Sequence, residues 1–408
     1  MLIQFSLENF KSFREQQMLS FVSTPGDEHI DHTLLLKNGL RINRFCALIG
    51  GNGAGKTQLI FAINELALAI HKDEYSQLHK PFSLSKDSRD KATVYEIIIL
   101  DSEKENFLRY GISTFHEKIL NEYLYSRPVK KGAREQCIFT RDSDGVKFKK
   151  ASYKKHELLI NPILKDTGSV ITFSKSLEAE ELSELKYWAI RQLPYRSNMF
   201  GDKTIEFFEE RFQKKMIKND NGDDEFDSET KKHLDLYNDF ITRTPLHIDG
   251  VKFVPFGKEN KYHFLFEIKG PEGELITIEP DMRYDFFSEG TMNILTFIAA
   301  MVWSYQTGFT LYVDEIDSSV HHSLASSLIK SVLNNQTERD DMQFVISTHN
   351  IPLLDECFRR DEVNIIIKSD NKSSQIINAS TFSVRKDAKI SAKYFRGEFG
   401  VLPNFLGL

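Results

Sequence analysis

The residues with the clearest chemistry form one glycine-rich run near the start of the chain, Gly50-Gly51-Asn52-Gly53-Ala54-Gly55-Lys56-Thr57. This run matches the pattern G-x-x-x-x-G-K-[ST], in which backbone N–H groups curl around a phosphate. We expect Lys56 to supply a cation to the β- and γ-phosphates. The hydroxyl of Thr57 would ligate Mg²⁺ at a helix N-terminus, whose dipole favours anions. The run therefore predicts a site for ATP with Mg²⁺.

A pair of carboxylates, Asp314 and Glu315, closes the apolar run 309–313. In this Walker B pattern Asp314 would hold Mg²⁺ through water, while Glu315 would orient or polarise the attacking water. An acidic pair at the end of a strand can also simply cap the helix that follows it. The phosphate-binding loop in the same chain favours the first interpretation.

Another apolar run, 344–348, ends in His349. A single histidine in such a place is usually a satisfied core or surface residue. Its position after the acidic pair predicts instead the switch histidine that senses the γ-phosphate in ABC ATPases. His349 therefore joins Asp314 and Glu315 as a catalytic candidate.

The run Ser288-Glu289-Gly290-Thr291 precedes an apolar helical stretch and resembles the ABC signature, with Ser-Glu-Gly in place of Ser-Gly-Gly. A serine before a helix is normally only a cap. However, Ser288 Oγ and the amides of Gly290 and Thr291 would form an anion site at a helix N-terminus, and nothing in the same subunit needs a second one. We therefore expect a γ-phosphate held by the P-loop of another protomer, that is, a head-to-tail homodimer around ATP.

Asp317 follows the acidic pair closely and would lie in a D-loop at the same dimer interface. Its alternative role is to cap the helix that starts near Val320, a role that Ser318 or Ser319 could also serve. The two roles can coexist. For a Q-loop the chain offers only Gln77, in the gap after the P-loop helix.

The elements that must position these residues follow from hydrophobic periodicity. The apolar run 44–49 leads into the glycine-rich loop, and apolar residues then recur at helical spacing from Leu59 to Ile70, so strand, loop and helix follow one another. Alternation predicts a hairpin from the runs 2–8 and 17–22, and an antiparallel pair from the runs 94–100 and 107–113.

From about Arg127 the character of the chain changes. Residues 127–155 carry ten Lys/Arg and three Asp/Glu, a net charge of +7. Helical stretches are expected at 179–192 and 203–218, followed by a polar acidic loop at 219–229. Strand signals resume at 262–268 and 274–278.

The predicted fold is an α/β P-loop ATPase head that is interrupted by an insertion. A mixed central sheet with flanking helices and an antiparallel β subdomain would form the head, and the insertion would be mostly helical. The expected domains are residues 1–126 with the Walker A motif, the insertion at 127–260, and residues 261–408 with the signature, Walker B, D-loop and switch histidine. No sustained heptads appear, so any arm is short and globular.

Composition limits the classes of protein to consider. The chain has 408 residues and a net charge of −6, which makes no global case for nucleic acid. Three widely spaced cysteines predict neither a disulfide framework nor a zinc site. No apolar run approaches the ~18–20 residues of a membrane helix, and no signal-peptide core opens the chain, so a cytoplasmic protein without a membrane partner is expected.

Taken in order, these motifs resemble those of the AAA-family ATPases that carry ABC-type motifs, the AAA15/AAA_21 group, which are relatives of the RecF and SMC heads. The resemblance rests on residues at both ends of the chain: LENFKSF, SEGT, DEID, STHN, RRDEV and YFRGEFGVLP. It implies a split head formed by both ends of the chain, with Lys11 or Arg14 near the nucleotide. The middle of the chain is not covered by it.

The resemblance also implies a function: an ATPase switch that dimerises on ATP and regulates a separately encoded nuclease or toxic effector in antiphage defence. The segment after His349 is too short for the TOPRIM nuclease domain of overcoming-lysogenization-type relatives, which favours a separate effector. The alternative is a RecF-like DNA-binding or repair ATPase, with Lys149, Lys150, Lys154 and Lys155 on phosphates. A transporter subunit would lack the insertion, and a GTPase would need an NKxD motif.

Overall fold

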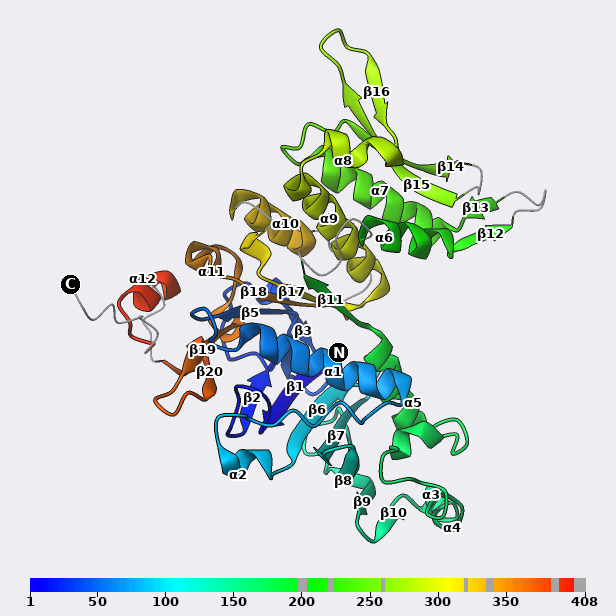
Figure 1. Ribbon diagram of the computed structural model, residues 1–408, viewed down its shortest axis with the longest axis vertical. Coiled ribbons are helices and arrows are strands. Elements are labelled where there is room, and N and C mark those ends of the chain that lie inside the picture. The colour runs from blue at the N-terminus through cyan, green and yellow to red at the C-terminus, as the bar shows by residue number, and fades with distance from the viewer. Residues whose placement is uncertain are drawn as a thin grey trace. The chain divides into compact units, whose positions relative to one another are not determined.

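The computed structural model describes residues 1–196, 204–218, 224–257, 261–318, 322–334, 341–382 and 389–399 (Figure 1). The chain forms two compact units. The first comprises Met1–Pro194 and Gln343–Leu408, and the second comprises Tyr195–Met342. The expected domain limits after residues 126 and 260 remain a prediction.

One sheet of the first unit is antiparallel throughout, with the strand order β10-β9-β8-β7-β6-β1-β2. The predicted hairpin pairs as β1 with β2, and the predicted antiparallel pair forms as β6 with β7, so both predictions are confirmed. The seven strands are β1 Leu2–Glu8, β2 Gln17–Ser20, β6 Thr93–Leu100, β7 Asn106–Phe115, β8 Lys118–Pro128, β9 Gln136–Asp142 and β10 Gly145–Phe148.

The second sheet of this unit is centred on β5 (Phe45–Ile49), all of whose residues are buried. Strands β18 (Gln343–Ser347) and β19 (Val363–Lys368) lie parallel to β5 on either side. Strand β20 (Ser374–Asn378) runs antiparallel to β19. A central parallel strand that is buried on both faces needs a continuous apolar sequence, and the run FCALI supplies it.

The P-loop connects β5 to α1 (Lys56–Lys72), as predicted. The apolar residues of α1 recur at positions three and four apart and are buried, among them Leu59, Ile63, Leu66 and Ile70. Helix α5 (Glu180–Ile190) packs against α1, and Lys186 Nζ lies 2.8 Å from Asp73 Oδ2 just beyond the end of α1. The predicted helix at 179–192 is thereby confirmed.

The remaining elements of the first unit are short. They are the hairpin β3 Thr33–Leu35 and β4 Arg41–Asn43, the 3₁₀ turns η1 Ile30–His32, η2 Val170–Phe173, η6 Arg360–Glu362 and η7 Ala379–Thr381, and the helices α2 Lys86–Arg89, α3 Ala151–Lys154, α4 Glu157–Ile160, α11 Ile351–Cys357 and α12 Ile390–Phe395. Strand β11 (Gln192–Arg196) lies at the boundary between the units.

The second unit is built around helix α9 (Glu289–Thr307), in which every residue from Leu295 to Tyr305 is buried. Helices α6 (Thr204–Gln213) and α7 (Ser228–Thr242) pack against α9. The unit also contains β12 Met216–Lys218, β13 Asp224–Phe226, β14 Gly250–Phe256, β15 Lys261–Lys269, β16 Leu275–Ile278, η4 Pro280–Met282, α8 Arg283–Phe286, β17 Thr310–Asp314, η5 Ile316–Ser318 and α10 His322–Asn334.

Two sequence predictions in this unit were partly wrong. The helix expected at 203–218 ends at Gln213, and its last residues form β12 instead. The acidic loop expected at 219–229 contains β13 and the start of α7. Cross-strand pairing of Met216 with Phe226 and capping by Asp227, whose side chain accepts from Thr230 N at 2.6 Å, order this polar stretch. Residues 219–223 lie outside the described residues.

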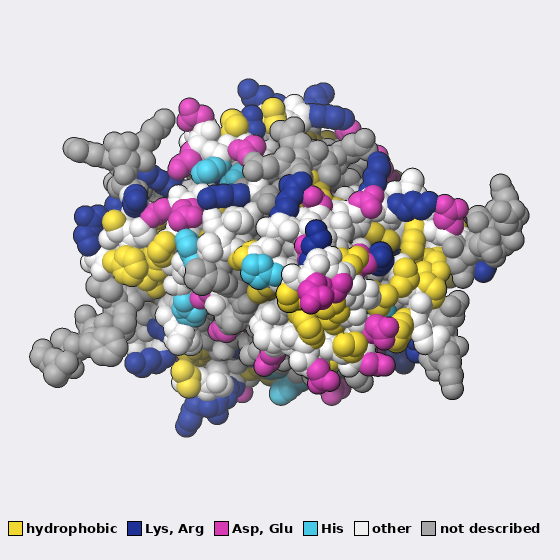
Figure 2. Space-filling view, turned by 90° about the horizontal axis from the view of Figure 1, so that it is seen from above, with side chains coloured by type: hydrophobic (Ala, Val, Ile, Leu, Met, Phe, Trp, Pro, Cys, Tyr) yellow, Lys and Arg dark blue, Asp and Glu magenta, His cyan; other side chains and the backbone are white. Residues whose placement is uncertain are grey.

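The face drawn in Figure 2 carries Lys/Arg and Asp/Glu side chains close together rather than in large areas of one sign. This mixture agrees with the modest net charge of −6. Among the described helices, none combines the length and the hydropathy that a membrane span requires.

Candidate nucleotide-binding site

The P-loop adopts a backbone that glycine alone accepts at two points. At Gly50, with φ 152°, an added Cβ would collide with the carbonyl oxygen of Ile366. At Gly55, with φ 124°, it would lie 2.8 Å from Ser374 Oγ and 2.9 Å from Ser12 Oγ. Because glycine lacks a Cβ, the loop can turn sharply onto the start of α1.

The P-loop lysine is held in place by its own loop. Lys56 is only 6% exposed, and its Nζ donates to the carbonyl oxygen of Gly50 at 2.9 Å. Thr57 follows in the first turn of α1, half-buried. Ala54 is buried, whereas Asn52 and Gly53 are exposed at the tip of the loop. A helix N-terminus, a lysine and a hydroxyl thus meet in one place, as phosphate and Mg²⁺ binding requires.

The structure brings His349 to this lysine. His349 Nε2 lies 3.2 Å from Lys56 Nζ, although 293 positions separate the two residues. The reason is topological: β18 and β5 are parallel neighbours, so the chain segments that follow them emerge at the same edge of the sheet. His349 is exposed there, directly beyond the buried end of β18.

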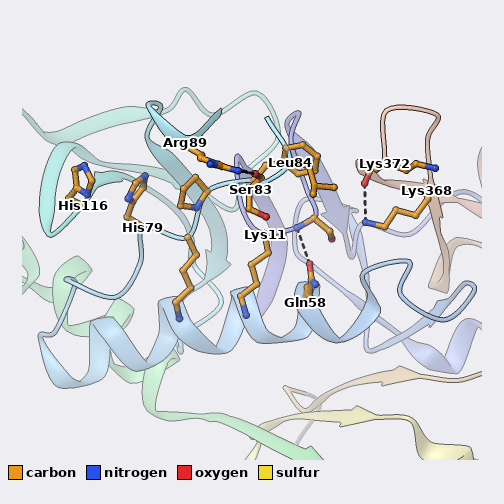
Figure 3. Close-up of a pocket in the computed structure, with 13 residues that line it drawn as sticks. Lys11, Gln58, His79, Ser83, Leu84, Arg89, His116, Lys368 and Lys372 are labelled. Carbon is orange, nitrogen blue, oxygen red and sulfur yellow. Dashed lines mark hydrogen bonds between the residues drawn. The ribbon is translucent and has the colours of Figure 1, made fainter. Parts of the chain in front are cut away.

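A pocket of about 780 Å³ adjoins the start of α1 (Figure 3). Its wall includes the turn after β1, the loop after α1 and the turn between β19 and β20. Five cationic side chains and no carboxylate are among its described lining residues; the cationic residues are Lys11, Lys80, Arg89, Lys368 and Lys372. Such a lining favours an anionic ligand.

Hydrogen bonds tie this pocket to the P-loop. Gln58, the third residue of α1, accepts from the backbone N–H of Ser12 at 2.9 Å, and both residues line the pocket. Ser374 Oγ donates to the carbonyl oxygen of Ala54 and is hydrogen-bonded to Ser12 Oγ at 2.7 Å. The turn after β1 and the start of β20 therefore buttress the phosphate-binding loop.

Lys11 lines the pocket and is half-buried. Its Nζ sits 3.9 Å from the ring centroid of Phe61, and burial together with the nearby charge of Lys80 lowers the pKa of Lys11. Lys80 in turn pairs with Glu65 of α1. Of the two residues expected near the nucleotide, Lys11 lines the pocket, whereas Arg14 has its Nε 3.5 Å from Glu15 Oε1 and is not among the lining residues.

Sequence reasoning missed most of this pocket. Its lining residues Ser12, Gln58, Lys80, Lys368 and Lys372 come from separate parts of the chain and show no motif spacing. These residues can be recognised as one pocket only because the fold brings their segments together. Gln77, the candidate for a Q-loop, is exposed and does not line the pocket.

The acidic pair belongs to the second unit. Asp314 is the last residue of β17 and is 5% exposed. Glu315 follows with φ 57°, in the left-handed region, and its side chain is exposed. A non-glycine residue held there costs about 1–3 kcal/mol, and such strain concentrates at functional sites. Asp317 lies in η5; residues 319–321 fall outside the described residues, and α10 begins at His322.

The serine of the signature-like segment caps α9. Ser288 Oγ accepts from the backbone N–H of Thr291 at 3.1 Å, so the capping interpretation is correct. Ser288 and Gly290 are nevertheless exposed at the helix N-terminus, where an anion could reach them. Just before this segment Arg283 Nη2 lies 2.6 Å from Glu209 Oε1, an ion pair that is almost fully buried and anchors α8 to α6.

The structure thus gathers one set of predicted residues within the first unit, namely the P-loop with Lys56, Thr57 and His349. The other set, Ser288, Gly290, Asp314, Glu315 and Asp317, lies within the second unit.

Residues 45–356 match the model of the AAA_21 family, which is described as "AAA domain, putative AbiEii toxin, Type IV TA system". The chain belongs to this family. As a member of AAA_21, it is an ABC-type ATPase by sequence. Among curated proteins, no sequence matches it significantly.

Solved structures add the fold of this AAA_21 protein. An SmcHead bound to the C-winged helix domain of ScpA is 13% identical, with a TM-score of 0.50 and coverage of 92% of this chain and 97% of that one. An SMC head domain from Thermotoga maritima is also 13% identical, with a TM-score of 0.42 and coverage of 94% and 99%. The first likeness confirms the predicted fold class, a P-loop ABC-type ATPase head.

Proposed function

We propose that this AAA_21 protein binds ATP with Mg²⁺ and hydrolyses it. The observation that carries the proposal is the approach of His349 Nε2 to Lys56 Nζ at the mouth of the P-loop. In the nucleotide complex Lys56 would exchange the Gly50 carbonyl for β- and γ-phosphate oxygens. His349 would then face the γ-phosphate as a hydrogen-bonding group.

The acidic pair would complete the chemistry. Thr57 and Asp314 would hold Mg²⁺, Asp314 through a water molecule. Glu315 would orient the attacking water, which must lie in line with the bond that breaks. Its exposed position beyond β17, with the backbone in the left-handed region, supports this role.

The ribose and base of the nucleotide would extend from the P-loop into the pocket beside α1. Gln58 and Ser12 lie where the pocket meets the phosphate-binding helix. The cationic lining would hold the α-phosphate side of the ligand, and the volume of about 780 Å³ falls within the range of small-molecule sites. Only part of this pocket was expected, through Lys11.

We further propose that two copies of the chain close around ATP. Ser288 and Gly290 present a helix N-terminus and a hydroxyl at an exposed position, the chemistry of a γ-phosphate site. They would bind the nucleotide held by the other protomer, with Asp317 at the same interface. Higher assemblies of such dimers would use the same contact.

The dimer would act as a switch for a separately encoded effector, most simply a nuclease or toxin of an antiphage system. The words "toxin" and "TA system" in the family description support such a setting. The solved SMC head that is bound to a domain of ScpA supports the idea that a head of this fold can bind a second protein.

The alternative of a RecF-like DNA-binding ATPase gains only partial support from the positive segment. Within it Lys147 pairs with Asp144, Lys150 with Glu181 and Arg141 with Glu122. These three charges are paired within the protein, whereas Lys149, Lys154 and Lys155 form no ion pair among the described residues. Salt-dependent DNA binding that is lost on reversing the remaining lysines would favour this alternative.

The direct test is ATP binding by calorimetry and phosphate release by the purified full chain, with and without EDTA. We expect binding in the micromolar range or tighter, and hydrolysis that stops when Mg²⁺ is removed. A purified, folded protein that binds no adenine nucleotide would refute the proposal.

A further inference from the structure

An apolar cluster stands exposed at the edge of the antiparallel sheet. Strand β10 is the edge strand, and α3 and α4 follow it directly (Figure 1). Leu158 is 86% exposed, Leu159 66% and Ile163 62%, so three of the most exposed large aliphatic side chains in the described chain lie within six positions. We refer to these three residues, together with Lys154 and Lys155, as the α3–α4 surface.

This exposure does not come from a loose loop. The backbone N–H groups of Ile160, Asn161 and Leu164 donate to carbonyl oxygens four residues earlier, so the segment forms helical turns. At this spacing Leu159 and Ile163 share a side. Tyr153 and Ile160 are buried beneath them.

Polar contacts fix these turns onto β10. The Asn161 side chain accepts from Val146 N at 2.7 Å and donates to Val146 O at 3.1 Å. Glu157 Oε1 accepts from Phe148 N at 2.6 Å. The aliphatic side chains are therefore presented in a preset arrangement, which lowers the entropy lost when a partner binds.

Four exposed lysines lie near this cluster in the sequence. Lys149, Lys154, Lys155 and Lys165 are exposed, and in the described part of the chain none of them forms an ion pair. Neighbouring lysines differ, since Lys118 and Lys147 pair with Asp166 and Asp144. Lys149, Lys154 and Lys155 of the segment 127–155, and Lys165 beyond it, thus flank the exposed aliphatic side chains in the sequence.

We propose that the α3–α4 surface docks an acidic segment of a separately encoded protein, one that presents an apolar stripe flanked by Asp and Glu. Aliphatic burial would provide affinity, and the lysines would speed and orient the encounter. The proposal rests on the effector-regulating part of the proposed function and identifies where and by what chemistry that partner would bind.

Two other occupants fit this surface less well. Single-stranded nucleic acid is held by aromatic side chains that stack on bases, and the exposed side chains here are aliphatic. A membrane surface is bound by long amphipathic helices, whereas α3 and α4 have four residues each.

The test places a photo-crosslinking amino acid at Leu158 in the full chain, expressed at its native level beside its neighbouring genes. We expect one dominant protein adduct, and mass spectrometry should place the crosslink in a segment with more Asp and Glu than Lys and Arg. With that partner purified, Leu158→Ser/Leu159→Ser and Lys154→Glu/Lys155→Glu should each weaken binding by about tenfold or more, which is about 1.4 kcal/mol. The lysine variant should also reduce the salt dependence of the affinity.

The matched control is Leu35→Ser, since Leu35 of β3 is 55% exposed but lies outside the surface; it should bind the partner like the unaltered chain. A crosslink to nucleic acid, to lipid or to a second copy of the chain would overturn the proposal, as would no adduct above that of a crosslinker at Leu35. Because none of these residues belongs to the nucleotide site, ATP hydrolysis is scored separately, and its absence would refute the proposed function instead.

Discussion

The two units of the molecule present functional side chains of opposite chemistry. In the first unit the P-loop, Lys56 and the adjoining pocket present cations and N–H groups, with Lys56 buried and hydrogen-bonded to its own loop. In the second unit Asp314 and Glu315 place two carboxylates at the end of β17, and Ser288 lies at a helix N-terminus. The first set suits the binding of polyphosphate, and the second suits hydrolysis and the sensing of a neighbour. Variants that change ATP binding without ATP hydrolysis, or hydrolysis without binding, therefore test this difference between the two units.

The largest effect is expected in the second unit. Glu315→Gln keeps the shape of the side chain but removes its ability to accept a proton, so hydrolysis should slow by about 10²–10⁴-fold. ATP affinity should stay close to that of the unaltered chain. Phosphate release measures the first effect, and an ATP-dependent dimer that persists in size-exclusion chromatography with light scattering would show the trapped state. Unchanged turnover would remove Glu315 from the mechanism.

In the first unit, Lys56→Ala should impair the binding of ATP itself. Loss of charge-assisted hydrogen bonds, each about 1.5–3 kcal/mol, should weaken ATP binding by about 100-fold or more. Calorimetric titration with Mg-ATP measures this loss of affinity. Lys72→Ala, at the exposed end of the same helix, is the matched control and should bind normally. Equal affinity of both variants for ATP would contradict the role of Lys56 in phosphate binding.

The variant Ser288→Arg tests whether the signature segment of one protomer acts on the nucleotide held by the other. The variant should bind nucleotide but not complete hydrolysis, with turnover reduced by about tenfold or more. Mixing it with Lys56→Ala should restore part of the activity, because one composite site of the mixed dimer has both an intact P-loop and an intact signature. Normal turnover by Ser288→Arg as an isolated monomer would exclude the trans site.

The smallest effect is expected in the pocket. Lys368→Glu/Lys372→Glu introduces negative charge into a lining without carboxylates, and ATP affinity should fall by about three- to tenfold at low salt, less at high salt. Lys37→Glu, an exposed lysine outside the pocket, is the control. If ATP binds equally well to both variants at low salt, the base and ribose lie elsewhere.

The sequence was a good guide wherever local rules decide structure. The strand before the P-loop, helix α1 and the antiparallel pairs β1–β2 and β6–β7 follow from periodicity and were predicted within a few residues. The glycine-rich turn of the P-loop was predicted as well, because its backbone conformation requires residues without a side chain. The polar stretch near Phe226 was misjudged, since a cross-strand pair and a helix cap outweighed its acidic composition.

What the sequence alone determined is the chemistry: a lysine and a hydroxyl at a phosphate loop, two carboxylates after a strand, and a serine before a helix. Only the tertiary structure decided which of them meet. Parallel pairing of β18 with β5 places His349 beside Lys56, and segments far apart in the sequence enclose a cationic pocket. Such contacts depend on strand order and loop approach, which long-range packing sets and no local pattern encodes.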